Sequence, residues 1–71
     1  MLQEYIDEIK RRLKEQNISI GYMAEDIGIN RKTIYNFLSG TNIINAMDFL
    51  IICDYLGIEL WGNRNDRQKR D

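Results

Sequence analysis

The sequence predicts an all-α domain, a compact bundle of four to five short helices with a helix-turn-helix at its centre. Up to Leu56, apolar residues recur at spacings of three and four, as they do on the buried face of a helix. Glycines follow three of these stretches, at Gly28, Gly40 and Gly57, where each is suited to end a helix. The chain has no proline, and no period-two alternation lasts long enough to indicate a strand.

The first helix is expected over residues 2–16, because Leu2, Ile6, Ile9 and Leu13 fall on one helical face. Asn17 then ends it.

Polar residues open the next two helices, which we expect over 19–27 and 30–39. Ser19 and Asn30 stand where a side-chain oxygen accepts a hydrogen bond from an unpaired amide of the first turn. Gly28 ends the first of these helices, and Ile29 follows it as a buried plug. The predicted inner faces consist of Met23, Ala24 and Ile27 on the first helix and Ile34, Phe37 and Leu38 on the second.

Asn45 is the expected cap of a fourth helix, with Asp48 three residues later as a short relative of the capping box. That helix runs to Leu56, and Gly57 closes it. Residues 58–61 add either a turn or a short fifth helix.

The 71 residues are expected to form one domain over 1–61, with a polar C-terminal tail over 62–71 that frays. No apolar run approaches the ~18 residues that span a membrane, and the N-terminus does not resemble a signal peptide. Cys53 is the only cysteine and lies among apolar residues, so it is expected in the core. These features predict an intracellular location.

The residues that catalysis needs are scarce. The chain has no histidine, its single cysteine has no activating partner, and neither a phosphate-binding glycine loop nor a metal-ligand motif occurs. We therefore expect no enzyme, no metal and no cofactor. The net charge is −1, but the basic residues are clustered, and a clustered basic face binds phosphate even when the total is near zero.

A short helix, a glycine turn and a second helix with a polar outer face form the layout of a DNA-reading helix-turn-helix. The spacing of the whole chain resembles that of the Cro and lambda-repressor family over about residues 2–60. The matching motifs are Met23-Ala24-Glu25 for its Leu-Ala-Glu, Gly28-Ile29-Asn30 for its Gly-Val-Ser turn, Thr33-Ile34 for its Thr-Ile, and Phe49, Ile52, Cys53, Leu56-Gly57-Ile58 and Leu60 for its fourth helix and following turn. Two positions depart from the family, since Ile20 replaces a frequent Gln and Leu38 a frequent Glu.

The resemblance implies a small phage or prophage regulator that binds double-stranded operator DNA in the cytoplasm of a bacterial or phage-infected cell. It places Arg31, Lys32 and Asn36 at base-reading positions, where Arg or Lys donates to guanine and Asn pairs with adenine. Tyr35 stacks on a sugar or touches a thymine methyl. The alternative is an ordinary solvated helix face.

Phosphate contacts are expected from small polar residues around these helices and at the start of the fourth. Asn45 is either a phosphate contact or only a cap, and Arg11, Arg12 and Lys14 either reach a flanking phosphate or form a solvated surface. The phosphate-contacting set is Ser19, Thr33, Ser39, Thr41, Asn42 and Asn45.

The fourth helix is apolar nearly all round, which is typical of a helix covered on more than one side. Met47, Ile51 and Tyr55 form a stripe that, with Leu60 and Trp61, predicts a protein interface. In the family such a surface commonly makes a homodimer that holds two recognition helices ~34 Å apart. The alternatives are a heteromeric complex with another repressor, or packing under the loops or tail.

Two functions therefore compete. One is a sequence-specific DNA-binding regulator, a repressor of Cro type. The other is an anti-repressor or modulator with the same fold that binds a partner repressor.

Overall fold

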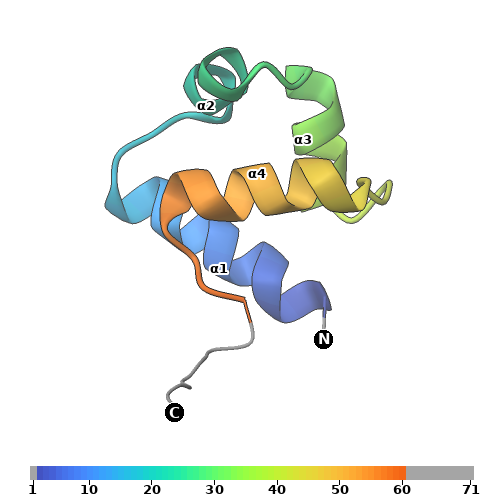
Figure 1. Cartoon of the computed structure of the whole chain (residues 1–71), viewed down its shortest axis with the longest axis horizontal. Helices are drawn as coiled ribbons and strands as arrows, with labels where there is room; N and C mark the ends of the chain where they lie inside the picture. The colour runs from blue at the N-terminus through green and yellow to red at the C-terminus, as the bar shows by residue number, and fades with distance from the viewer. Residues whose placement is uncertain (1, 61–71) are drawn as a thin grey trace, which may run out of the picture.

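The computed structural model describes residues 2–60 and contains four helices in that range. These are α1 (Leu2–Glu15), α2 (Ile20–Ile27), α3 (Arg31–Leu38) and α4 (Ala46–Leu56). In Figure 1, α4 crosses the middle of the molecule, with α1 below it and α2 and α3 above it. Helix α1 packs on α3 and α4, and α2 packs on α3 and α4. The all-α fold is confirmed, and no strand occurs in the described range.

Side-chain caps fix where α2, α3 and α4 begin. Ser19 Oγ accepts from the Tyr22 amide at 3.0 Å, and Asn45 Oδ1 accepts from the Asp48 amide at 2.8 Å. Ser19 and Asn30 are therefore caps, and the helices begin one residue later than we expected. The box at α4 is also modified, because the Asp48 carboxylate accepts from the Asn45 side-chain amide at 3.3 Å instead of from its backbone.

Left-handed residues end three of the helices as expected. Gly28 and Gly57 each have φ of 75°, and their amides bond carbonyls of the last turn. After α1, Asn17 takes φ of 58°, and the Ile18 amide donates to the Leu13 carbonyl at 2.8 Å. Residues 57–60 contain no helix. Of the two structures expected for residues 58–61, the described part therefore agrees with a turn and not with a fifth helix. Trp61 and the expected frayed tail lie outside the described residues.

One apolar core joins all four helices. Ile9, Met23, Ile34 and Ile52 have no exposed surface, and Phe37 has 1%. The full core consists of Ile6, Ile9, Leu13, Met23, Ala24, Ile34, Phe37, Leu38, Ile52, Cys53, Leu56 and Ile58. Burial raises the pKa of the Cys53 thiol, as expected for a core cysteine that is not a nucleophile.

Four expected core positions are less buried than their pattern indicates. Ile27 and Ile29 are half-buried, so Ile29 packs against the core but is not the buried plug we expected. Leu2 is 46% exposed because it begins α1, where no neighbouring helix covers it. Phe49 is also half-buried, but its ring stacks edge-on against Tyr5 and Phe37, with centroids 5.6 and 6.0 Å apart.

Candidate nucleic-acid interface

Helix α3 separates its apolar and polar residues cleanly. Ile34, Phe37 and Leu38 face the core and are at most 4% exposed. On the opposite side, Arg31 and Lys32 are exposed and Tyr35 is 61% exposed. The buried side holds the helix to the body of the protein, so the polar side is presented outward on a rigid element. This is the arrangement that a base-reading helix needs.

Asn30 organises the first turn of this helix. Its Oδ1 accepts from the Lys32 amide at 2.8 Å and from the Thr33 amide at 3.4 Å. The cap leaves the side chains of Lys32 and Thr33 exposed. Asn30 was predicted only as a cap, but it also lines the hollows on both flanks of the first turn of α3.

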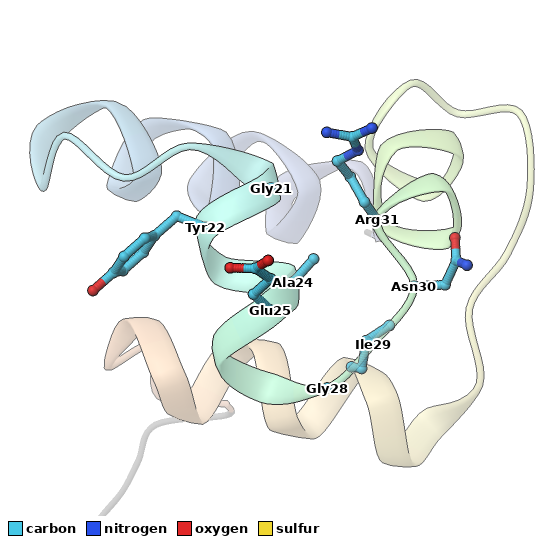
Figure 2. Close-up of a pocket in the computed structure, with 8 residues that line it drawn as sticks. All are labelled: Gly21, Tyr22, Ala24, Glu25, Gly28, Ile29, Asn30 and Arg31. Carbon is cyan, nitrogen blue, oxygen red and sulfur yellow. The ribbon is translucent and has the colours of Figure 1, made fainter.

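Arg31 lies over the beginning of α2. A crevice between α2 and the start of α3 is lined on one side by Gly21 and Glu25 and on the other by Asn30 and Arg31. Figure 2 shows the Arg31 side chain extending from the first turn of α3 toward Gly21, whereas Tyr22 points away from the crevice. The three ion pairs found among residues 2–60 do not include Arg31.

The opposite flank of α3 brings several predicted residues together. Lys32, Thr33 and Asn36 line a hollow with Asn42 and Ile43 of the loop between α3 and α4. Asn36 is half-buried, since this loop folds against it. The structure thus places Asn36 at the edge of the outer face and not at its exposed centre.

Backbone hydrogen bonds fix the loop after α3. The Asn36 carbonyl accepts from the amides of Thr41 and Asn42, at 2.9 and 3.3 Å, and from Ser39 Oγ at 3.0 Å. The hydroxyls of Ser39 and Thr41 lie 3.0 Å apart. Both residues are exposed, as is Asn42, so they border the outer face of α3 as a fixed polar rim. Ser19 and Asn45 are exposed caps at the starts of two other helices.

Two lysines of α1 complete the surroundings of α3. Lys10 and Lys14 line an apolar hollow together with Tyr35 and Ser39. For Lys14 the sequence left open a flanking-phosphate contact or a solvated surface, and Lys10 was not considered. The two lysines lie one helical turn apart, on the side of α1 next to its buried face. This spacing could have shown from the sequence that they act as a pair.

Arg11 and Arg12 of α1 are committed to contacts within the chain. Arg11 bonds Glu8 and Glu15, and Arg12 Nε donates to Glu8 at 2.8 Å. The hydrogen bonds that Glu8 accepts from Arg11 and Arg12 lower its pKa to about 2, and the bond from Arg11 has the larger effect. The flanking-phosphate option considered for these two arginines is therefore the weaker one.

The outward side of α4 carries an apolar patch. Met47 is 66% exposed, Leu50 is 44% exposed, and Ile43 in the preceding loop is 86% exposed. Of the four predicted interface residues that the structure describes, Met47 is largely exposed and Ile51, Tyr55 and Leu60 are half-buried; the fifth, Trp61, lies outside the described range.

Tyr55 already has a partner inside the chain. Its hydroxyl donates to the Asp26 carboxylate at 2.8 Å, and this bond, with partial burial, raises the pKa of Tyr55. The Tyr55–Asp26 bond ties α4 to α2. The exposed apolar surface is therefore centred on Ile43, Met47 and Leu50. Ile43 and Leu50 were not among the residues predicted for this interface.

Among residues 2–60, no group of three or more His, Cys, Asp and Glu side chains is placed to hold a metal ion. In that range there is also no helix with the length and hydropathy required to cross a bilayer.

A family model described as helix-turn-helix matches residues 9–60, which is more than half of the chain. Comparison with curated proteins and with solved structures gave no significant match. The matched range includes α2, its glycine turn and α3, together with α4 and most of α1. The chain therefore belongs to the helix-turn-helix family of Cro and lambda-repressor type, whose members are DNA-binding transcriptional regulators.

Proposed function

We propose that this protein is a sequence-specific repressor of Cro type, of phage or prophage origin, that reads the major groove of an operator with α3. The observation that carries this proposal is the outer face of α3. Arg31 and Lys32 are exposed there beside Tyr35, and no ion pair within residues 2–60 neutralises them. Guanidinium and ammonium groups presented in this way donate to the O6 and N7 atoms of guanine.

The surroundings of α3 suit the neighbouring phosphates. Lys10 and Lys14 flank one side of the helix together with Ser39, and Asn42 borders the hollow on the other side. Small hydroxyl and amide side chains and lysines commonly donate to phosphate oxygens, and such contacts fix the register of a protein on the duplex. We therefore infer that the centre of this face contacts bases and that its edges contact phosphates.

The first experiment is a fluorescence-anisotropy titration of a mixed-sequence duplex at low and moderate salt. We expect weak binding that falls with salt, with a log–log slope of about −0.9 for each neutralised phosphate. A selection from random duplexes would then identify the operator. Absence of binding even at low salt would refute the proposal.

We further propose that two copies act together through the exposed apolar patch of Ile43, Met47 and Leu50. Ile43 also lines the hollow beside Lys32 and Asn36, so the patch adjoins the proposed DNA-contacting face. Contact through the patch would therefore place the α3 helices of two copies at adjacent parts of one duplex. Sedimentation equilibrium with operator DNA should give two chains per duplex, and Met47→Asp should reduce this to one. Asp54→Ala, at an exposed polar position of the same helix, is the control.

The same patch supports a second function, that of a modulator that binds a partner repressor. It is favoured by the exposure of Ile43 and by the apolar, half-buried Ile20 at a position where the family often has Gln. Under this function, Met47→Asp abolishes activity whereas Arg31→Ala with Asn36→Ala leaves it intact. Under the repressor function, the Arg31 and Asn36 changes abolish operator binding.

A further inference from the structure

Gly21 stands in an unusual place for a glycine. It is the second residue of α2, and glycine is a poor helix former because it has more backbone freedom to lose than other residues. The other glycines within residues 2–60 are Gly28, Gly40 and Gly57, and each has a φ between 75° and 82° that other residues rarely adopt. No such backbone requirement applies to Gly21, so its role must come from the space beside it.

That space is used by Arg31. A Cβ atom at position 21 would lie 3.4 Å from Cδ of Arg31 and 3.6 Å from one of its terminal guanidinium nitrogens. A methyl group would just fit in ordinary contact, whereas a longer side chain would occupy the volume that the arginine fills. Figure 2 shows this approach of Arg31 to Gly21 across the opening of the crevice.

Arg31 lies beside Gly21 without an ion pair to any of residues 2–60. None of the ion pairs in the described range involves Arg31, although Glu25 lines the same crevice. Ile20 is apolar, so its side chain provides no hydrogen bond to orient a neighbour. The backbone surface at Gly21 thus limits where the Arg31 side chain lies but leaves its donors unused. A long side chain that is restrained before binding loses less conformational entropy when it binds.

We propose that Gly21 is a positioning residue that aims Arg31 and so sets a preference for guanine at one position of the operator. The inference rests on the proposed DNA-binding function and adds to it the residue and the base. Arg31 donates two hydrogen bonds to the major-groove edge of guanine, and this recognition requires a fixed direction of approach. A side chain at position 21 would push the guanidinium away from that direction.

The test uses the full chain and the operator duplex that the unchanged protein selects from a random pool. Affinities are measured for the unchanged protein, Gly21→Ala, Gly21→Leu, Arg31→Ala and the double variant Gly21→Leu with Arg31→Ala, against the operator and its single-base variants. We expect Arg31→Ala to relax discrimination at one guanine by about 5- to 100-fold. Gly21→Leu should relax the same position and no other.

Two comparisons separate positioning from a general loss of structure. Gly21→Ala should bind like the unchanged protein, because its methyl group fits beside Arg31. In the Arg31→Ala background, Gly21→Leu should have no further effect, since a residue that acts only through Arg31 has nothing left to position. A further loss in that background, or undisturbed guanine discrimination in Gly21→Leu, would overturn the inference.

Thermal unfolding reports whether Gly21→Leu folds, and Gly21→Gln, a better helix former than glycine, replaces it if it does not. The NMR signal of the Arg31 Nε–H group, recorded without DNA, gives an independent reading. It should move and become more mobile in Gly21→Leu or Gly21→Gln but not in Gly21→Ala, and an unchanged signal would contradict the positioning role. If the unchanged protein selects no operator, the proposed function itself fails, and the inference fails with it.

Discussion

Two helices of this protein carry adjacent basic residues, Arg11 and Arg12 on α1 and Arg31 and Lys32 on α3, and their surroundings differ. Arg11 is paired with carboxylates one turn away on either side. Arg12 bonds Glu8, and its guanidinium also donates to the carbonyls of Leu56 and Gly57 at 3.1 and 3.0 Å. On α3, by contrast, the ion pairs of the described range include neither Arg31 nor Lys32.

The difference follows from which residues share a helix. Helix α1 has Glu8 and Glu15 within one turn of Arg11, whereas α3 contains no acidic residue. Neighbouring carboxylates satisfy the α1 arginines locally, and the carbonyls that end α4 complete the shell of Arg12. The net charge of −1 therefore says little about DNA binding, since Glu8 and Glu15 pair with the arginines of α1 while the ion pairs of the described range leave out the α3 cations.

The sharpest test of this contrast is a matched pair of arginine substitutions. Arg31→Ala should lower operator affinity by about 1–3 kcal/mol and leave the midpoint of thermal unfolding unchanged, because Arg31 is exposed and its loss opens no cavity. Arg11→Ala is the control and should leave operator affinity unchanged. Anisotropy titrations and thermal melts of both variants decide the matter, and equal losses of affinity would remove the distinction between the two helices.

Arg12→Ala should show the reverse pattern. It removes a cationic donor from the last carbonyls of α4, where a positive charge also complements the helix dipole, and should lower the free energy of unfolding by about 1–2 kcal/mol. Urea unfolding measures this change. Arg12→Lys is the matched variant and should restore part of the stability, since it keeps the charge but not the fork of donors. A loss of DNA affinity without a loss of stability would place Arg12 in the interface instead.

The fold was predictable because its signals are local. The apolar spacing, the caps Ser19, Asn30 and Asn45 and the turn glycines each report on residues within one helical turn. Errors arose where burial depends on distant segments. Leu2 and Ile29 fit the pattern of a core residue, but no element packs closely enough on them to bury them fully.

The candidate site was less accessible from the sequence than the fold. The outer face of α3 follows directly from its inner face, so the exposure of Arg31, Lys32 and Tyr35 was foreseeable. The contacts that distinguish this protein join separate segments: Arg31 on Gly21, Tyr55 on Asp26, and Arg12 on the end of α4. Helical periodicity contains no information about such pairs, which depend on how the helices cross.

A smaller effect is expected from the lysines that α1 places beside α3. If Lys14 contacts a phosphate, Lys14→Gln should weaken binding to all duplexes alike and reduce the magnitude of the salt slope by about 0.9. The readout is anisotropy over a series of salt concentrations. Arg11→Gln removes the same charge from the paired side of α1 and should leave the slope unchanged. Unequal losses between sequences would show that Lys14 reads bases.

The ion pairs of Glu8 on α1 should make the stability of the protein sensitive to acid. The folded-state pKa of Glu8 is about 2, against an ordinary value of 4.5, because Arg11 and Arg12 donate to its charged form. A lowered pKa means that Glu8 contributes stability above pH 4.5, and that this contribution is lost as the pH falls toward 2. The Glu8→Gln variant should therefore have a lower melting temperature than the unchanged protein at neutral pH. The melting temperatures of the two proteins should converge as the pH falls from 4.5 to 2. A difference in melting temperature that stays constant down to pH 2 would mean that the arginines do not hold the Glu8 carboxylate in solution. In that case the contrast between α1 and α3 would rest only on the Arg11–Glu15 pair and on the positions of the two helices in the molecule.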